Sequence, residues 1–243
     1  NCTICSGASA VKFGTASYGG FKNVTINSIK IFDTYRSALA LESVDGGIIE
    51  NIIVSNIVAE NTGNGIFIRL GHRDGTNPGI VRNIHISNVK VKVPFGRPDL
   101  NYDIRVSEPS FHHISFPSSI AGIPGHYVQD VEFENIEISY PGRASKGQAY
   151  ISLNRLTMVP EKIKKYPEFS MFGELPAWGF YIRHVKGIKM NNITLTLDDT
   201  DFRPAFVFDD VIGINLKEII GPKNKQTDQI ILKDYSEFEM NPQ

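Results

Sequence analysis

Residues able to do acid–base and ion-pairing chemistry occur at matching points of neighbouring segments in the first third of this chain. Two carboxyl groups, Glu42 and Asp45, lie three residues apart. Carboxyl groups catalyse hydrolysis when one donates a proton and another activates water, so these two are the catalytic candidates. Groups that can bind carboxylates or hydroxyls lie nearby, and the substrate-binding candidates are Lys12, Tyr18, Arg69, His72 and Arg73.

A short repeated pattern indicates which elements position these residues. Asn, Asp or Gly begins each copy, aliphatic residues then alternate with other residues, and a second Asn follows in most copies. The copies are Asn23–Ile29, Asn51–Ile57, Asn83–Val89 and Asp130–Ile136, with weaker ones beginning at Gly187 and Gly213. Such alternation predicts strands, and the repeat predicts that they stack in parallel at about 4.8 Å. We therefore predict an all-β solenoid.

Asparagines occupy one position of the repeat. They are Asn56, Asn88, Asn135 and Asn192. Asn tolerates a left-handed backbone, and stacked amides can bond to one another from coil to coil. We predict a structural ladder at this position.

The spacing of the copies predicts one domain over residues 1–243. Its coils should cover about 1–91, 129–138 and 179–220. Two loop excursions are expected at 92–128, which contains five prolines, and at 139–178, with a turn or two of helix near Met158–Lys165. Residues 221–243 are expected to form a C-terminal tail.

A second strand should precede each copy and carry the candidate site. Residues 12–23 and 40–51 match without a gap at a spacing of 28 residues. If Phe13 and Leu41 point inward, Lys12, Glu42 and Arg69 project outward on three neighbouring coils. We expect a charged, exposed wall beside a groove, and a long groove suits an extended carbohydrate chain better than a small metabolite.

Composition excludes several classes of partner. The 243 residues carry 25 Lys and Arg against 26 Asp and Glu, and the formal net charge is −1. Nucleic acids and anionic membranes call for a basic patch, and no basic block occurs, so neither is an expected partner. No apolar run reaches the roughly 18 residues of a membrane span, and no signal peptide is visible.

No residue spacing predicts a metal site. The acidic residues near the C-terminus lack the loop pattern of a calcium site, so solvated turns are predicted at Asp198, Asp199, Asp201, Asp209 and Asp210. Cys2 and Cys5 should pack as small hydrophobes without bonding to each other. Trp178 and Phe180 could stack on a sugar or cap the core, and the core is the favoured prediction.

Three strings carry a resemblance to a known family. They are Lys-Phe-Gly-Thr at 12–15, Val-Asp-Gly-Gly at 44–47 and Ile-Phe-Ile-Arg-Leu-Gly at 66–71. With the repeat, they make nearly the whole chain resemble a divergent, mostly bacterial branch of polygalacturonase-type enzymes, glycoside hydrolase family 28. The resemblance implies a right-handed, single-stranded parallel β-helix of the pectin-lyase-like kind. Ala8-Ser9-Ala10 stands in place of the family's Gly-His-Gly, and Ala40-Leu41-Glu42 in place of Arg-Ile-Lys.

The resemblance also implies an activity, namely inverting hydrolysis of a pectic or related acidic polysaccharide without a cofactor. Because the family's acid and base precede the Gly-His-Gly position, the principal carboxylates are expected upstream of Asn1. The chain would then be the C-terminal portion of a longer β-helix, and its missing N-terminal half a partner beside the polysaccharide. The resemblance implies a secreted or periplasmic bacterial protein.

Other interpretations fit the same residues. The β-helix could bind a polysaccharide without cleaving it, or carry a lyase or epimerase, because a fold does not fix a reaction. Lys12, Glu42 and Arg69 could form a surface charge ladder, and Asp45 before two glycines could be a turn residue. His72 could serve only to satisfy a hydrogen bond.

Overall fold

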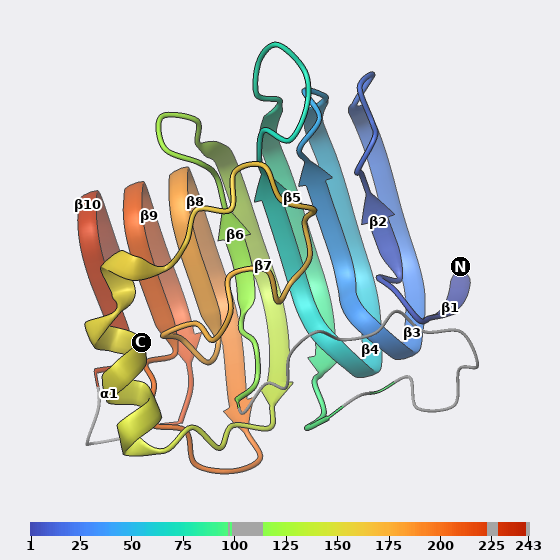
Figure 1. The fold of residues 1–243 in the computed structure, drawn as a ribbon. Helices are drawn as coiled ribbons and strands as arrows, with labels where there is room; N and C mark the ends of the chain where they lie inside the picture. The colour runs from blue at the N-terminus through green and yellow to red at the C-terminus, as the bar shows by residue number, and fades with distance from the viewer. Residues whose placement is uncertain (97, 99–113, 223–227, 242–243) are drawn as a thin grey trace.

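Parallel strands stacked in chain order make up most of the regular structure (Figure 1). The computed structural model describes residues 1–96, 98, 114–222 and 228–241. The strands are β1 (Cys2–Ser6), β2 (Val11–Phe13), β3 (Phe21–Ser43), β4 (Ile48–Leu70), β5 (Ile80–Lys92), β6 (Ser118–Ala121), β7 (Val128–Tyr140), β8 (Phe180–Leu197), β9 (Phe206–Ile220) and β10 (Ile230–Asn241). A helix α1 (Lys146–Asn154) and a 3-10 turn η1 (Leu156–Met158) complete the described elements. The predicted all-β fold with parallel strands is confirmed.

Each strand pairs with the one that follows it one repeat later. The order is β1-β3-β4-β5-β7-β8-β9-β10, and every pairing between named strands is parallel. Phe21 of β3 lies opposite Ile49 of β4, which is the 28-residue spacing of the sequence repeat. Residues far apart in the sequence are thereby placed side by side at the spacing of paired strands.

The short strand β6 closes the pairings into a ring. It pairs with Phe67–Arg69 of β4 and with Phe180–Arg183 of β8, whereas β5 and β7 pair with other parts of these long strands. The five strands β4, β5, β7, β8 and β6 therefore enclose a common interior. This closure requires β4 and β8 to bend, because their two parts belong to different sides of the ring.

Left-handed residues lie at regular positions within the long strands. Asn56, Asn88, Asn135 and Asn192 all have φ between 53° and 57°. Their amides bond in sequence, with Nδ2 to Oδ1 distances of 3.3 Å from Asn88 to Asn56, 3.0 Å from Asn135 to Asn88 and 2.7 Å from Asn192 to Asn135. The predicted ladder is confirmed, and it sits where a short amide side chain lowers the cost of positive φ.

The interior is filled by rows of aliphatic and aromatic side chains. One row joins Ile52, Ile84, Val131, Ile188 and Ile214, each at most 1% exposed. Trp178 and Phe180 belong to this core as predicted, and Phe180 stacks on Phe206 with ring centroids 5.7 Å apart. Burying such a side chain stabilises the fold by about 1.5–3 kcal/mol.

The predicted boundaries of the first loop excursion and of the C-terminal tail need correction. Strand β6 lies within the excursion expected at 92–128, of which residues 97 and 99–113 are outside the described part. Strand β10 lies within the expected tail and pairs with β9 at a spacing of 24 residues. Both departures have one cause, since short or charged strands gain their pairing from neighbours rather than from their own hydrophobic pattern.

The helix and the cysteines also differ from the predictions. Helix α1 precedes Met158–Lys165, and it begins at a capping box in which Ser145 accepts from the backbone of Gln148 and Gln148 accepts in return. Cys2 and Cys5 are unbonded as predicted, but both are exposed, because β1 lies at the edge of the stack and pairs with β3. Among the described residues, no helix is long and apolar enough to cross a membrane.

The inward and outward faces of one strand can be compared directly through Ile52→Ala and Ile53→Ala. Ile52 is 0% exposed and its neighbour Ile53 is 47% exposed. Ile52→Ala should lower the free energy of unfolding by about 2–5 kcal/mol because it leaves a cavity. Ile53→Ala should change it by about 0.5 kcal/mol or less. Urea unfolding measures both values, and equal losses would contradict the assignment of faces.

Candidate functional site

Two rows of outward side chains run across the stack. The first row is Lys12, Ala40, Phe67, Ser119, Tyr181, Val207 and Ile231. The second row is Glu42, Arg69, Ala121, Arg183, Asp209 and Lys233. Strand register therefore brings the predicted Lys12, Glu42 and Arg69 together on neighbouring strands.

A covering segment, residues 155–178, lies over these rows. Its Leu156, Phe169 and Phe172 pack with Phe67 and Tyr181 in a second apolar cluster. Glu42 and Arg69 are each only 1% exposed as a result. The prediction of an exposed wall is wrong for these two residues, because outward side chains of the strands form a second, buried layer.

Arg69 anchors the covering segment. Its guanidinium donates to the carbonyl oxygen of Gly122 at 2.7 Å and to that of Glu161 at 2.7 Å, and it lies 5.1 Å from the Phe172 ring centre. Burial lowers the pKa of Arg69 to about 10. Arg69 was predicted to bind substrate, but its described partners are main-chain oxygens of this chain.

Glu42 is a buried carboxyl group with an altered pKa. Burial raises its pKa from the ordinary 4.5 to about 7, although Lys12 opposes this shift from 2.8 Å away. Lys12 also donates to the Tyr166 hydroxyl at 3.2 Å. Tyr166 and Lys12 thus border Glu42, which can exchange a proton near neutral pH but does not face solvent.

The remaining predicted binding residues and Tyr166 form a partly exposed rim beside Glu42, which we define as Lys12, Tyr18, His72, Arg73 and Tyr166. Arg73 binds both oxygens of Asp45, with Nε to Oδ1 at 2.8 Å and Nη2 to Oδ2 at 2.6 Å. The guanidinium carbon of Arg73 also lies 5.7 Å from the Tyr166 ring centre. Asp45 is only 2% exposed, so it acts as the ion-pair partner of Arg73.

Tyr18 and His72 occupy the outer part of the rim. Tyr18 is 60% exposed, and its hydroxyl donates to the Asp74 carboxylate at 3.0 Å. The pKa of Asp74 is lowered mainly by a hydrogen bond from the Gly75 amide and further by this bond from Tyr18. His72 Nε2 lies 2.9 Å from the carbonyl oxygen of Gly75. The turn after Asp45 comes close to Tyr18 because Gly47 has no side chain, and a Cβ there would overlap the Ser17 carbonyl oxygen.

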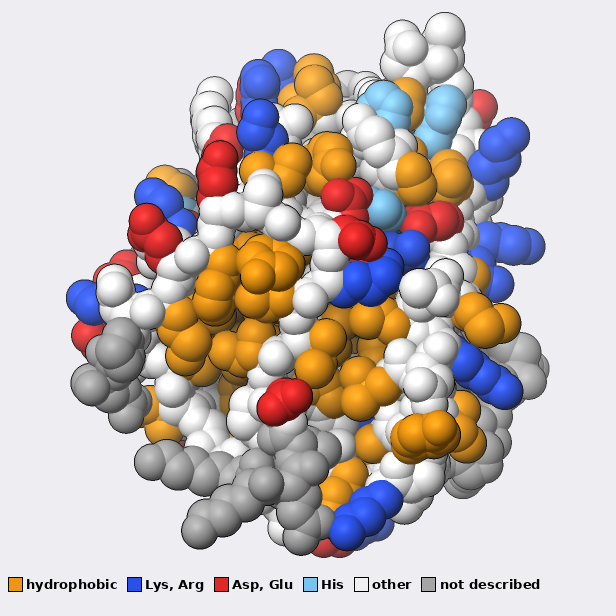
Figure 2. Space-filling model, turned by 90° about the vertical axis from the view of Figure 1, so that its left-hand side faces the viewer, with side chains coloured by type: hydrophobic (Ala, Val, Ile, Leu, Met, Phe, Trp, Pro, Cys, Tyr) orange, Lys and Arg blue, Asp and Glu red, His pale blue; other side chains and the backbone are white. Residues whose placement is uncertain are grey.

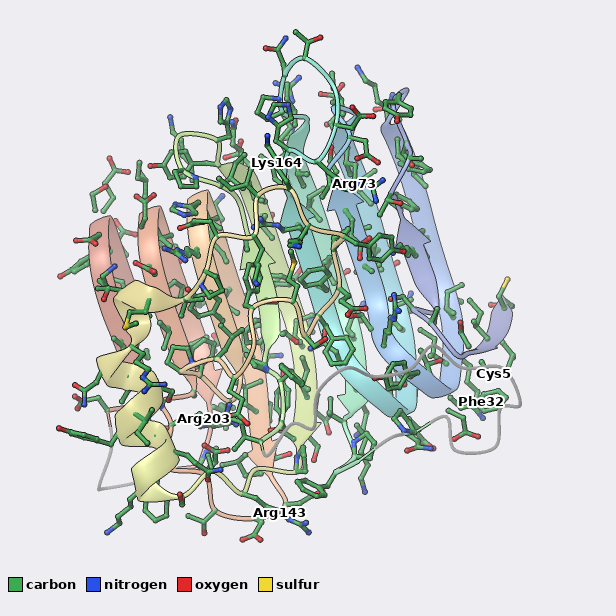
Figure 3. The ribbon with its side chains drawn as sticks, in the orientation of Figure 1. Cys5, Phe32, Arg73, Arg143, Lys164 and Arg203 are labelled. Atoms are coloured by element: carbon green, nitrogen blue, oxygen red, sulfur yellow. The ribbon has the colours of Figure 1, made fainter. Side chains whose placement is uncertain are left out.

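Tyr166 is the rim residue that the sequence did not indicate. It comes from the covering segment, and its ring receives Lys12 at 4.9 Å and Arg73 at 5.7 Å. The main chain of this segment is fixed beside the rim, because the His72 amide donates to the Ile163 carbonyl oxygen at 2.9 Å. Lys164 belongs to the covering segment, and Figure 3 shows it at the same end of the strands as Arg73.

A second polar cluster lies farther along the same edge. His184 bridges two carboxylates, with Nδ1 2.6 Å from Asp210 and Nε2 3.1 Å from Glu161. Arg183 contacts Glu161 at 2.5 Å and Asp209 at 3.1 Å. Figure 2 shows acidic, basic and histidine side chains gathered above a broad hydrophobic area at the β10 end of the stack.

The prediction of solvated turns is confirmed for the exposed Asp198 and Asp199, but it is wrong for the buried Asp201 and for Asp209 and Asp210, which lie in β9. Asp209 is 1% exposed and also binds Lys233 at 2.6 Å, while Asp201 is 2% exposed and binds Arg203 at 2.8 Å. The repeat carried a signal for the cluster, since Arg183 on β8 lies opposite Asp209 on β9, one repeat later. In the part of the chain that the structure describes, no group of three acidic, His or Cys residues could hold a metal ion.

The altered pKa of Glu42 makes the stability depend on pH. Its folded pKa of about 7 lies above the ordinary 4.5, so the folded state binds more protons between these values. The free energy of unfolding should therefore fall as pH rises from 5 to 8, by about 1–3 kcal/mol from this group. Glu42→Gln, which imitates the protonated group, should remove this part of the slope in urea unfolding.

Glu50→Gln is the matched control. Contacts with Arg82 and Lys22 lower the pKa of Glu50, so this group stays ionised at both pH values. Its substitution should have the same effect on unfolding at pH 5 and pH 8. Parallel pH profiles for the wild type and Glu42→Gln would contradict the assigned pKa.

The chemistry of this edge follows from its own residues. It offers two exposed aromatic rings, a paired guanidinium and a buried carboxyl group that titrates near neutrality. Comparison of the chain with family models, with curated proteins and with solved structures finds no match in any of the three.

Proposed function

We propose that the stack is a right-handed, single-stranded parallel β-helix and that the protein is a glycoside hydrolase for pectic or related acidic polysaccharide. Parallel pairing at the repeat spacing and the left-handed residues of each coil support the fold. The strings at 12–15, 44–47 and 66–71 support the family, through the resemblance described above. That resemblance also supports a secreted or periplasmic location.

The rim is the observation that carries this proposal. The Tyr18 and Tyr166 rings, 60% and 46% exposed, provide flat apolar surfaces on which sugar rings can stack. Arg73 and Lys12 lie over the Tyr166 ring and provide donors for carboxylates and hydroxyls next to its exposed part. An edge with both kinds of group suits a charged sugar polymer.

Glu42 is the carboxyl group of this chain best suited to act as a general acid. A pKa of about 7 keeps a substantial protonated fraction at neutral pH, as proton donation to a leaving oxygen requires. The side chain is 1% exposed beneath Lys12 and Tyr166, so these two residues must move before Glu42 reaches a sugar. Asp45, the other candidate, forms an ion pair with Arg73 through both of its carboxylate oxygens.

The same burial favours a second candidate function, a non-catalytic module that binds polysaccharide. The rim can bind a polymer without any movement, because Tyr18, Arg73 and Tyr166 are already accessible. In this case Glu42 would serve only the packing beneath the rim. Binding and bond cleavage therefore have to be measured separately.

Binding is tested by Tyr18→Ala with polygalacturonate oligosaccharides in titration calorimetry. Loss of one stacking ring should weaken affinity by about three- to tenfold, which corresponds to 0.5–1.5 kcal/mol. Tyr235→Ala is the control, since Tyr235 is 51% exposed but lies on β10. Equal affinities for the two variants would remove Tyr18 from the proposed site.

Cleavage is tested by the release of reducing ends from polygalacturonate. If Glu42 is the general acid, Glu42→Gln should reduce kcat by about 100-fold or more while the oligosaccharide affinity stays the same. Glu50→Gln should leave both values unchanged. Binding without release by the wild type would favour the binding module, and the absence of both would overturn the proposal.

A further inference from the structure

A cationic loop lies beside the rim, and we define it as the lysine flap, Val159–Tyr166. Lys162, Lys164 and Lys165 place three ammonium groups within four residues. None of the three forms an ion pair with any residue that the structure describes. Lys164 and Lys165 are exposed, so their charge is available to a ligand.

The first half of the flap is fastened to the strands beneath it. Arg183 donates to the Val159 carbonyl oxygen at 2.8 Å, and Arg69 donates to that of Glu161 at 2.7 Å. The Glu161 carboxylate is bound by Arg183 and His184, and despite burial these groups lower its pKa. The Glu161 carboxylate is thus held by Arg183 and His184 and forms no ion pair with the flap lysines.

The second half of the flap is fastened to the rim. The His72 amide donates to the Ile163 carbonyl oxygen at 2.9 Å, and Lys12 donates to the Tyr166 hydroxyl at 3.2 Å. Arg73 of the rim is paired with Asp45, and Lys12 contacts Glu42, which is partly protonated near neutral pH. Among the described residues, the three flap lysines add positive charge without a paired carboxylate, and they outnumber the one exposed carboxylate bonded to the rim, Asp74.

A fixed main chain with unpaired cations is suited to anion binding, because little ordering is required when the ligand arrives. Neighbouring side chains on this loop also lie within a Debye length of about 8–10 Å at moderate salt, so their attractions for a polyanion act together. Lys164 and Arg73 lie at the same end of the strands (Figure 3).

We propose that the lysine flap is an anion-binding site that makes the protein select carboxylate-bearing polysaccharide over its uncharged counterpart. The inference rests on the proposed function, because it takes the rim as the place where the polymer binds. The flap then adds charge selection next to the stacking surfaces of Tyr18 and Tyr166. Lys162, Lys164 and Lys165 are the specificity-determining residues.

The test compares polygalacturonate with its fully methyl-esterified form, which has the same backbone without the charge. Wild type should bind the acid form more tightly, and this preference should weaken as salt increases from 50 to 200 mM. Lys164→Glu with Lys165→Glu should reduce affinity for the acid form by about tenfold or more and leave affinity for the ester nearly unchanged. The double Arg variant at the same two positions should keep the preference.

Lys186→Glu with Lys189→Glu is the control for net charge. These two lysines are exposed on the part of β8 that pairs with β7, and their reversal changes the net charge by the same amount. If both charge reversals reduce the preference equally, or if wild type binds the two polymers equally, the flap inference is overturned while polysaccharide binding stands. Failure of wild type to bind either polymer overturns the proposed function together with the inference.

Discussion

Parallel pairing in register is the constraint on which the rest of the structure depends. Each long strand pairs with the next one with equivalent residues of the repeat opposite, so a change of side chain in one repeat alters the packing of the next. Left-handed residues lie at equivalent positions of the long strands. The side-chain amides of the Asn residues at one of these positions bond from each strand to the next. Apolar rows fill the interior, and the outward rows bring distant residues together in a second layer, much of which the covering segment buries.

Arginine side chains connect the strands to the segments that cover them. Arg69 and Arg183 donate to carbonyl oxygens of the lysine flap. Arg203, which is 0% exposed and labelled in Figure 3, pairs with Asp201 and donates to the carbonyl oxygens of Leu175 and Ala177. A guanidinium group has five donors in one plane, so one side chain can satisfy several loop carbonyls that would otherwise be buried without a partner.

The sequence predicted what depends on periodicity and missed what depends on the covering segment. The strand repeat, the Asn ladder, the core position of Trp178 and the adjacency of Lys12 with Glu42 all follow from alternation and spacing. Burial of Glu42 and Arg69 did not, because alternation tells which side of a strand a residue occupies but not whether another segment lies over it. Tyr166 entered the site from a segment without periodicity, so only the folded chain could place it.

The outermost strand β10 has a consequence for solubility. Among the described strands it pairs only with β9, so a row of main-chain donors and acceptors on its other side remains a template for a strand from another molecule. Lys233, Glu237 and Glu239 place charges along β10, and Asp234 and Glu237 have left-handed backbone that breaks its straight course. Charge and curvature on an edge both oppose intermolecular β-pairing, so these residues act as gatekeepers against aggregation where the stack is open.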